Sequence, residues 1–219
     1  MQFTKFARTK LTIFAPLEKK ARIYWSEQTE STNTDAWELA SADSEHSANL
    51  SVIATRWQTA GRGQGDHKWH AAPGENLTFT IILRYDGRKG SFAPFPAAQQ
   101  KAVSDLTAQA VVDYLAGHGV EAWIKQPNDV YVEDRKICGM LIKHCVRSGF
   151  LKYSILGIGI NINETEFPSD LPNPTSLLLE LRRLGKDVNA RYETDRELDR
   201  FLAVFESACA RLFTEVTED

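Results

Sequence analysis

Residues 50–83 read LSVIATRWQTAGRGQGDHKWHAAPGENLTFTIIL, with apolar runs on both sides of a glycine-rich loop. The runs at 50–55 and 77–83 each predict a buried strand. Between them, glycines alternate at 61, 63 and 65, with Arg62 between the first two. Glycine lets the backbone approach a ligand closely and offer N–H groups to an anion. An ordinary glycine-rich surface loop would read the same way, so this loop alone does not establish a site.

The element after the glycine loop limits the choice of fold. In Rossmann and P-loop proteins the glycine-rich loop opens a helix, and the N-terminus of that helix binds phosphate. Here residues 77–83 predict a strand in that place. Strand–helix–strand alternation is also missing along the chain, so we expect no doubly wound sheet.

A helix and a series of strands follow the loop. Residues 97–116 carry apolar side chains at four-residue steps and predict a helix, which Gly117 and Gly119 would end. Polar turns separate the later apolar runs, which predicts an antiparallel meander. The predicted strands lie at 23–25, 50–57, 77–83, 122–124, 130–132, 137–146 and 151–162, and the predicted helices at 36–40, 97–116, 176–184 and from 194 onward.

This order of elements predicts an α+β domain, with a mixed, largely antiparallel sheet and helices packed mainly on one side. The final helix is expected to open with a capping box, Thr194-Asp195-Arg196-Glu197, and to bury a stripe that includes Phe201 and Phe205.

Composition excludes several classes of protein. The 219 residues are 42% hydrophobic and 25% charged, with a net charge of −3, which fits one substantial globular domain. Mild acidity argues against a protein that binds nucleic acid mainly through phosphate contacts, so no DNA partner is expected. No apolar run reaches the length of a membrane span, and Pro16 breaks the only apolar piece of 1–22, so neither a span nor a signal peptide is expected.

Cysteine usage points to a reducing compartment. Cys138, Cys145 and Cys209 form an odd set with no CxxC pair and no histidine at zinc spacing. Packed thiols explain them better than a metal site. We therefore expect a cytoplasmic location and no metal ligands from the protein.

Polar clusters recur at the ends of the predicted strands. They are Ser31-Thr32-Asn33, the loop 58–69, Lys125-Gln126-Pro127-Asn128-Asp129, Lys136-Ile137-Cys138-Gly139, Gly157-Ile158-Gly159-Ile160-Asn161 and Pro174-Thr175-Ser176-Leu177. Each has an ordinary explanation: a helix cap, a turn, a solvated lysine or a hydrogen bond at a strand end. Their order along the chain is more informative than any one of them.

In this order and spacing, the clusters resemble the catalytic domain of the biotin–protein ligases, over about residues 23–184. The family signatures read approximately STN, QxxGRGRxGRxW, KWPND, KxxGIL, GxGIN and PTSL, and each has a counterpart here. The resemblance implies the fold shared by class II aminoacyl-tRNA synthetases and biotin ligases. It also implies an enzyme that joins biotin to a protein in two steps.

In the implied reaction, the carboxylate of biotin attacks the α-phosphate of ATP and gives biotinyl-5′-AMP and pyrophosphate. A lysine amine of a biotin carboxyl carrier protein or domain then attacks the mixed anhydride and releases AMP. Biotin and ATP are therefore the expected ligands, with Mg²⁺ bound through ATP rather than by the protein. The implied enzyme is cytoplasmic and either a monomer or a homodimer.

The resemblance assigns roles to individual residues. Lys136 and Arg62 are the expected catalytic residues. The expected biotin-binding residues are Ser31, Thr32, Asn33, Gln58, Gly61, Arg62, Gly63, Gln64, Trp69, Lys136, Gly157 and Gly159. The expected ATP-binding residues are Arg62, Lys125, Asn128, Lys136 and Asn161.

The biotin-binding residues suit the shape of that ligand. The ureido ring has two N–H donors and one carbonyl acceptor, and a few fixed polar groups in an apolar pocket can read it. Ser31, Thr32 and Gln58 supply both donors and acceptors, which matters because an unpaired buried polar group costs about 1–3 kcal/mol. Trp69 and the strand glycines would line the ring and its chain.

The charged residues suit the chemistry. Two anions must meet in the first step, so preorganised cations and N–H groups are the main need. Lys136 would bridge the reacting groups, and Lys125 would neutralise the β- and γ-phosphates. Arg62 and the N–H groups of Gly61 and Gly63 would hold carboxylate and phosphate together.

The chain departs from the family pattern in its loop. Gln64 replaces an arginine, Asp66 a glycine and His67 a second arginine, while Gln126 replaces the tryptophan of KWPND. Two positive charges are lost from a loop that should enclose the adenylate. We therefore expect weaker adenylate retention, or retention that relies on other cations.

The resemblance divides the chain into an N-terminal extension at 1–22, a catalytic domain at 23–190 and a C-terminal helix at 191–219. No helix-turn-helix domain is expected before the catalytic domain, so no repressor activity is expected either. The small β-barrel domain that many members carry after it is expected to be absent.

Two alternatives remain open. One is a lipoate–protein ligase of the same fold, and the other is a biotin- or adenylate-binding protein without activity. Lipoate has no ureido ring for Ser31, Thr32 and Gln58 to bind. The presence of Lys136 and Arg62 argues against an inactive protein.

Overall fold

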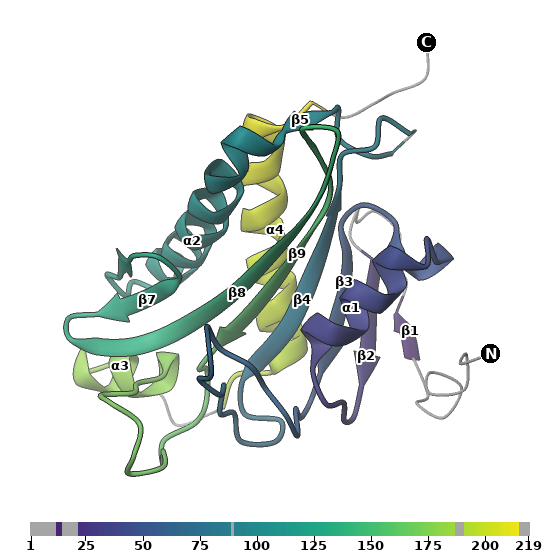
Figure 1. The fold of residues 1–219 in the computed structure, drawn as a ribbon. Coiled ribbons are helices and arrows are strands. Elements are labelled where there is room, and N and C mark those ends of the chain that lie inside the picture. Colours follow the sequence, from purple (N-terminus) through teal and green to yellow (C-terminus); the bar gives the residue numbers. More distant parts are fainter. Residues whose placement is uncertain (1–11, 15–21, 89, 187–190, 215–219) are drawn as a thin grey trace.

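The computed structural model describes residues 12–14, 22–88, 90–186 and 191–214. The strands of this part form one nine-stranded sheet in the order β1-β2-β3-β4-β9-β8-β7-β6, with β5 paired to β9 outside this path (Figure 1). The strands are β1 Thr12–Phe14, β2 Arg22–Ser26, β3 Ser51–Thr55, β4 Leu77–Arg84, β5 Phe95–Pro96, β6 Trp123–Lys125, β7 Asp129–Val132, β8 Arg135–Arg147 and β9 Phe150–Ile160. Each predicted strand is confirmed, with its ends shifted by a few residues.

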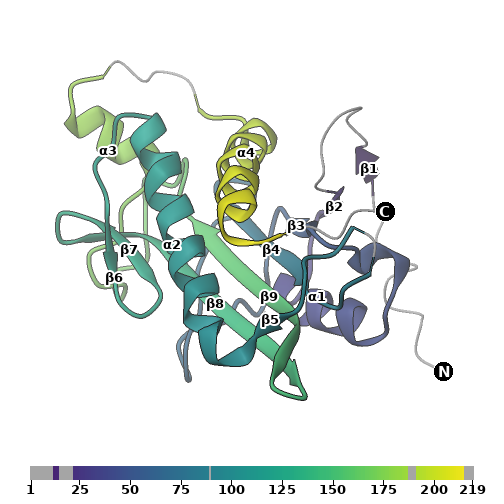
Figure 2. The same cartoon turned by 90° about the horizontal axis from the view of Figure 1, so that it is seen from above.

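Helices cover the two faces of the sheet unequally. α2 (Gln100–Gly117) and α4 (Thr194–Leu212) pack on one face and α1 (Thr32–Ser41) packs on the other (Figure 2). α3 (Leu177–Arg183) adds to the larger of the two buried clusters, on the side of α2 and α4. The predicted α+β class, with helices mainly on one side, is confirmed. None of the helices described here is long and apolar enough to cross a membrane.

One pair of strands makes the sheet mixed. β2 and β3 run parallel, with Ile23 opposite Val52, and α1 connects them along one face of the sheet. The expectation that strand–helix–strand alternation is missing is therefore wrong for this segment. Its three elements are evident in the sequence, but hydrophobic periodicity does not say which strands become neighbours.

The N-terminal region contributes one short strand. Residues 12–14, part of the predicted extension, form β1 and pair antiparallel with β2. Residues 1–11 and 15–21 lie outside the described part of the chain. The predicted boundaries of the extension and of the catalytic domain stay predictions.

β3 and β4 are buried along their whole length. Because α1 packs on one face and α4 on the other, neither face of these central strands meets water. Continuous β-branched and apolar runs such as SVIAT follow from this double burial, where a strand with one wet face would alternate. On the α4 side, the rings of Phe79 and Phe201 pack with their centroids 5.2 Å apart.

On the face covered by α1, the side chains of β9 become smaller toward the end of the strand. Ile155 packs under α1, but Gly157 and Gly159 follow at the same two-residue spacing. The pairing register sets Gly159 between Thr78 of β4 and Gly139 of β8. Since alternate residues of a strand share a face, large side chains give way to very small ones at this end of the sheet. That change leaves room for a cavity.

All three cysteines carry free thiols rather than disulfides. Cys138 and Cys209 are buried, and Cys145 is partly buried. Burial raises the pKa of the Cys138 thiol, which keeps it protonated and unreactive. The prediction of packed thiols is confirmed.

α4 begins at Thr194 as predicted, but the capping box does not form. No side chain caps the helix, and the Thr194 hydroxyl accepts a hydrogen bond from Arg56 at 2.8 Å. Glu197 is only 2% exposed; its Oε2 accepts from the Tyr114 hydroxyl at 2.8 Å and lies 2.9 Å from His118 Nε2. The carboxylate therefore joins α4 to the C-terminal end of α2. The capping-box pattern was misleading because the partners of Glu197 lie on α2, which is distant in the sequence.

The Glu197 contacts make stability depend on pH. Burial alone would raise the pKa of the Glu197 carboxyl, but hydrogen bonds from His118 and Tyr114 and the charges of His118 and Arg200 lower it overall. A carboxyl whose pKa is lowered by folding stabilises the folded state above its ordinary pKa of about 4.3. That stabilisation is lost as the pH falls through the lowered value.

We expect Glu197→Gln to reduce the free energy of unfolding by about 2 kcal/mol at pH 7, because a buried hydrogen-bonded charge is removed. The gap to the wild type should narrow below about pH 4, where the wild-type carboxyl also loses its charge. Chemical denaturation at several pH values measures both effects. Glu193→Gln is the matched control, since Glu193 pairs with Arg196 on the surface and should leave stability nearly unchanged. Equal losses in both variants, or a gap that ignores pH, would contradict this role.

Candidate functional site

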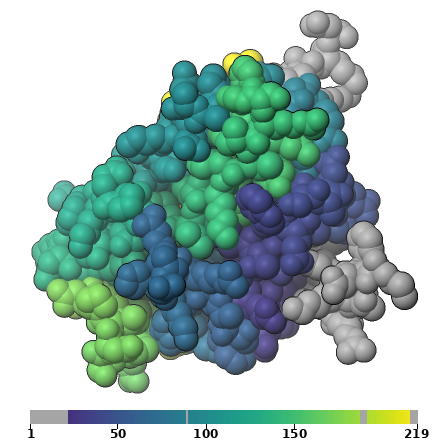
Figure 3. All heavy atoms as spheres, viewed as in Figure 1, coloured from purple at the N-terminus to yellow at the C-terminus, as the bar shows by residue number. Residues whose placement is uncertain are grey.

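A cavity of about 270 Å³ opens on the α1 side of the sheet, at the end where the strand glycines lie. Figure 3 shows this side of the molecule, with the blue loop between the indigo atoms of α1 and the green strands. Most of the predicted site residues line the cavity: Ser31, Thr32, Asn33, Gln58, Arg62, Gly63, Gln64, Trp69, Asn128, Lys136, Gly157 and Gly159. The fold thus brings together clusters that lie far apart in the sequence.

Residues 61–69, here called the glycine hairpin, form one wall. The Gly63 N–H donates to the His67 carbonyl at 2.8 Å, and the Trp69 N–H donates to the Gly61 carbonyl at 3.1 Å. An ideal Cβ on Gly61 would lie 2.5 Å from the Trp69 carbonyl oxygen, so this crossing of the two arms requires glycine. The expectation that the Gly63 N–H faces an anion is therefore wrong for this structure, because the hairpin itself uses that donor.

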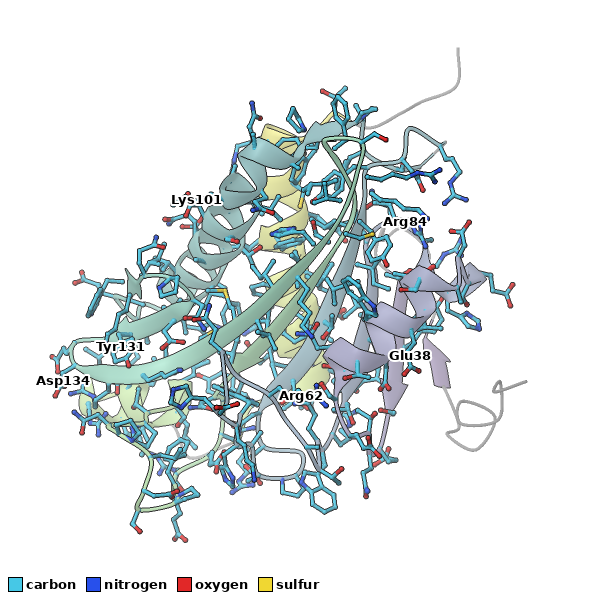
Figure 4. All side chains as sticks on the ribbon, viewed as in Figure 1. Glu38, Arg62, Arg84, Lys101, Tyr131 and Asp134 are labelled. Carbon is cyan, nitrogen blue, oxygen red and sulfur yellow. The ribbon has the colours of Figure 1, made fainter. Side chains whose placement is uncertain are left out.

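The glycine hairpin still brings cations to the cavity. Arg62 pairs with Lys68 through an antiparallel backbone bridge, and both residues line the cavity. Figure 4 labels Arg62. His67 lines the cavity as well. Positive charge from Lys68 thus accompanies Arg62, although the arginines expected at 64 and 67 are missing.

Trp69 rests directly on the strand glycines. An ideal Cβ on Gly159 would lie 2.3 Å from Trp69 Cε2, and one on Gly139 would lie 2.9 Å from Trp69 Cζ3. Any side chain at either position would displace the indole. Trp69 Nε1 is buried and has no hydrogen-bond partner in the described part of the chain, which is unusual for an indole.

Asn33 meets β9 in a similar way. An ideal Cβ on Gly157 would lie 2.3 Å from Asn33 Nδ2, and this nitrogen donates to the Leu141 carbonyl at 2.8 Å. Because an amide nitrogen only donates, the bond fixes which way the side chain points. Asn33 Oδ1 is buried and accepts no hydrogen bond from the residues that the structure describes. Asn33 thus lines the cavity with its side chain held in a fixed orientation. The expectation that both strand glycines contact the ligand needs refinement, since Asn33 and Trp69 pack on them first.

Gln58 joins the glycine hairpin to α1. Its Oε1 accepts from the Thr32 N–H at 2.8 Å and from the Thr32 hydroxyl at 3.1 Å, while the Thr80 hydroxyl donates to Thr32 Oγ1 at 2.9 Å. Thr32 thus orients Gln58, and the Gln58 amide N–H groups are left to bind a ligand. Ser31 stands at the N-cap position but makes no side-chain capping bond, so the explanation of this residue as a plain cap is wrong.

Lys136 lies on β8 across the cavity. Its Nζ is 2.8 Å from Asp129 Oδ1 and its side chain is only 30% exposed, so the explanation as a solvated turn lysine is wrong. The backbone of Lys136 is held on both sides. Its N–H donates to the Asn173 carbonyl at 2.7 Å, and its carbonyl accepts from the Thr175 N–H at 2.9 Å. Asn173 and the PTSL segment that follows it therefore fix the backbone of Lys136, the expected catalytic residue.

The neighbouring Arg135 anchors this wall to α3. Its Nε and Nη2 donate to the two oxygens of Glu180 at 2.9 and 3.0 Å, and Thr175 and Arg183 donate to the same buried carboxylate. Burial alone would raise the pKa of Glu180, but the hydrogen bonds from Arg135 and Thr175 and the charges of Arg183 and Arg135 lower it overall. The carboxylate therefore stays ionised and bidentate.

Three predicted residues lie outside the cavity. Gly61 is buried at the hairpin crossing. Lys125 on β6 lies with its Nζ 4.6 Å from the ring centroid of Tyr131, which Figure 4 labels. Asn161 is buried and donates to the Thr175 carbonyl at 2.9 Å, which favours the alternative that it is a structural residue at a strand end.

Residues to which the sequence analysis assigned no binding or catalytic role complete the walls. They are His67, Lys68, Thr78, Phe79, Asp129, Gly139, Met140, Leu141 and Ile158. Asp129 stands inside a quoted turn motif, and Gly139 inside another, so both could have been assigned. Thr78 carried no signal, because it reaches the site only through the register of β4 with β9. Asn128 lines the cavity, but its Nδ2 donates to the Met140 carbonyl at 2.9 Å, which gives it a structural role as well.

The described residues contain no group of three or more His, Cys, Asp or Glu side chains that could hold a metal ion. Asp129, the carboxylate in the cavity wall, is already paired with Lys136.

Comparison with known proteins matches residues 25–161 to the Biotin/lipoate A/B protein ligase family. The chain belongs to this family. Among curated relatives, the bifunctional ligase/repressor BirA of Bacillus spizizenii is 33% identical over 144 residues, 64% of this chain and 41% of that protein. A biotin–acetyl-CoA-carboxylase ligase of Paracoccus denitrificans is 31% identical over 135 residues, 62% of this chain and 52% of that protein. The chain thus spans about half the length, or less, of these curated relatives.

Solved structures of biotin protein ligases share the fold of this Biotin/lipoate A/B protein ligase family member. The Aquifex aeolicus protein in complex with biotin and ATP has a TM-score of 0.64 at 22% identity, covering 86% of this chain and 70% of that one. The Leishmania major protein in complex with biotinyl-5-AMP has a TM-score of 0.68 at 19% identity, covering 91% and 77%. At these identities the likeness shows the fold alone.

We expect Gly159→Ala to expel the Trp69 indole from the strand floor, because the new methyl group would overlap the ring. Overpacking of this kind costs about 1–3 kcal/mol of stability. The Trp69 emission, taken as the difference from a matched Trp69→Phe variant, should move to longer wavelength as the ring meets water. Gly117→Ala is the control, since no atom lies within 4 Å of its ideal Cβ. Unchanged emission and stability in Gly159→Ala would mean that the ring does not pack there.

Proposed function

We propose that this chain is an ATP-dependent biotin–protein ligase, which forms biotinyl-5′-AMP and transfers biotin to a lysine of a carboxylase carrier domain. Family membership limits the choice to the biotin and lipoate ligases and proteins derived from them. The polar groups of the cavity then favour biotin.

The observation that carries this choice is the oriented amide of Gln58. Its Oε1 is held by Thr32, and its N–H groups could donate to the ureido carbonyl. Asn33 lines the same cavity, and its Oδ1, which has no hydrogen-bond partner among the described residues, adds an acceptor for a ureido N–H. The dithiolane ring of lipoate offers these side chains no hydrogen-bonding group, and each buried polar group left unpaired costs about 1–3 kcal/mol. The indole of Trp69 and the small residues of the floor suit the rest of the bicyclic ring.

The cations around the cavity suit a reaction between two anions. In the first step the biotin carboxylate would attack the α-phosphorus of ATP, and pyrophosphate would leave. In the second step the acceptor amine would attack the carbonyl carbon of the mixed anhydride, lose a proton and displace AMP. Lys136, Arg62 and Lys68 would stabilise the negative charge that develops at the reacting groups. Asp129 and the PTSL segment hold Lys136 in place for this task.

Lys125 and Mg²⁺ would complete the nucleotide site. ATP is expected to bring its own Mg²⁺, since Asp129 is paired with Lys136. Lys125 is the register partner of Asp129, one strand further out on the sheet, which supports a contact with the β- and γ-phosphates. The free thiols fit a cytoplasmic location.

A transfer assay tests the proposal. The full chain is incubated with ATP, Mg²⁺, biotin and a purified biotin carrier domain, and the carrier is probed with streptavidin. We expect a biotinylated carrier, with labelled biotin displaced by biotin but not by lipoate. Lys136→Ala should slow adenylate formation by about 10²–10³-fold, because one preorganised charge is removed. Lys143→Ala, an exposed lysine on the same strand, should match the wild type.

The other outcomes identify the alternatives. Lipoyl transfer in place of biotin transfer would make the chain a lipoate ligase. Tight biotin binding without transfer would make it a non-catalytic binding protein. A Lys136→Ala variant with full activity would remove Lys136 from the mechanism.

The loop departure gives a separate prediction. Gln64 lines the cavity where the family pattern has an arginine, and it can donate hydrogen bonds but cannot neutralise charge. We expect Gln64→Arg to slow the release of biotinyl-5′-AMP by about tenfold, the effect of one added charge contact to a phosphate. Stopped-flow dissociation of the preformed adenylate measures the rate. An unchanged or faster release would contradict this prediction and indicate that other residues, such as Lys68, already bind the phosphate of the adenylate.

A further inference from the structure

A buried carboxylate outside the cavity holds the glycine hairpin in place. Glu164 follows β9 by a few residues and is only 3% exposed. It is absent from the cavity wall, and the proposed reaction gives it no chemical role. Carboxylates this deeply buried occur almost only where they are paired, so the partners of Glu164 indicate its purpose.

Among the described residues, the hydrogen-bond partners of Glu164 all belong to residues 70–76, the segment that leads from the glycine hairpin into β4. Glu164 Oε1 lies 3.1 Å from His70 Nε2. Glu164 Oε2 accepts from the Ala72 N–H at 3.2 Å and from the Asn76 side-chain amide. The other end of the Asn76 amide accepts from the Ile162 N–H at 2.9 Å, which closes the connection to the end of β9.

The opposite arm of the hairpin is fixed to a different part of the protein. The Thr59 N–H donates to the Thr29 carbonyl at 2.9 Å, and the Ala60 N–H donates to the Glu30 carbonyl at 3.0 Å, just before α1. One arm is therefore attached to the start of α1 by backbone hydrogen bonds. In the other arm, the far end is held by the backbone, since the Asn163 N–H donates to the Glu75 carbonyl at 2.9 Å and the Gly74 N–H donates to the Arg56 carbonyl at 2.8 Å. Glu164 holds the near end, at His70 and Ala72. Trp69 is the last residue before the Glu164 contacts begin.

We propose that Glu164 is a positioning residue, which sets the place of Trp69 over the strand glycines and thereby the outer wall of the cavity. The Trp69 indole packs on Gly159 of β9, and Glu164, four residues beyond the end of β9, contacts His70. Residues 69–70 are therefore held at two points, one on β9 and one on the chain that continues from it. Without Glu164, Trp69 would keep its backbone bond to Gly61, but on its other side the nearest remaining anchor would be the Gly74 N–H bond to the Arg56 carbonyl, five residues away. The link to biotin binding rests on the proposed function.

The first test uses the full chain without ligand. Glu164→Gln keeps the size of the side chain but sets an amide group against the donors of Ala72 and Asn76. We expect hydrogen exchange of residues 61–69 to speed up by about tenfold or more, while α2 exchanges as in the wild type. Glu75→Gln is the matched control, because Glu75 lies in the same segment but pairs with Arg191. His70→Gln, which removes one partner only, should give a smaller increase and serves if Glu164→Gln does not fold.

The second test asks whether Glu164 acts through Trp69. Glu164→Gln should raise the KM for biotin by about tenfold or more, with a smaller change in kcat, because the binding wall is displaced and the reacting groups are not. In a Trp69→Ala background the same change should alter KM by less than about twofold, since the residue being positioned is gone.

The results separate this proposal from the proposed function. Unchanged exchange of residues 61–69 in both Glu164→Gln and His70→Gln would overturn the proposal, as would KM effects that simply add in the double variant. Faster exchange in α2 as well would reduce Glu164 to a general stability residue and would also overturn it. If the wild type fails to use biotin, the proposed function falls, while the exchange test still decides whether Glu164 positions the hairpin.

Discussion

The site depends on the contact between one indole and two glycines that face each other across β8 and β9. Trp69 occupies the space that side chains at Gly139 and Gly159 would fill. Protein interiors are close-packed, so this contact sets the distance between the glycine hairpin and the sheet. The cavity is what remains between the hairpin, α1 and the sheet. Its size therefore follows from the absence of two methyl groups on the strands.

Around that contact, the polar groups are fixed by bonds that they make elsewhere. Asn33 is oriented by the Leu141 carbonyl, Gln58 by Thr32, and the Lys136 backbone by the PTSL segment. Asn33 Oδ1 and the Gln58 amide N–H groups have no partner among the described residues, while the Lys136 ammonium is paired with Asp129. A site of this kind needs little reorganisation on binding, which favours both affinity and specificity. The charged groups depart from the family signature, since Gln64 and His67 stand where the signature has arginines, and Lys68 lies opposite Arg62 in the glycine hairpin.

Much of the cavity lining could be predicted from the sequence, because the order and spacing of its motifs resemble the family signatures. The two-residue spacing of Gly157 and Gly159 already places both on one face. Three-dimensional pairing supplied the rest. Thr78 enters the site only through register, and the Gly63 N–H is lost to the hairpin, which no periodicity reveals. The failed capping box at Thr194 has the same cause, since Glu197 is bound by residues of α2.

The fold was predictable to a similar depth. Strand positions followed from apolar runs and turns, and the antiparallel meander followed from its short connections. The parallel pairing of β2 with β3 could not be predicted from the sequence, because the sequence of α1 does not indicate that the chain returns to the strand next to β2. Sequence patterns indicate the secondary structure and the buried face of each segment, whereas the packing of the whole chain determines which strands pair.

The alternation along β9 has a consequence for how such a protein can evolve. Leu156 and Ile160 are buried residues of the main core, while Gly157 and Gly159 lie under the pocket. Adjacent codons of one short strand are thus under two separate kinds of selection, one for folding and one for ligand. A lineage could drift in the first set by exchanging one aliphatic residue for another and leave the chemistry untouched. A single step in the second set, from glycine to anything larger, would change the shape of the pocket while the core beneath it stayed whole.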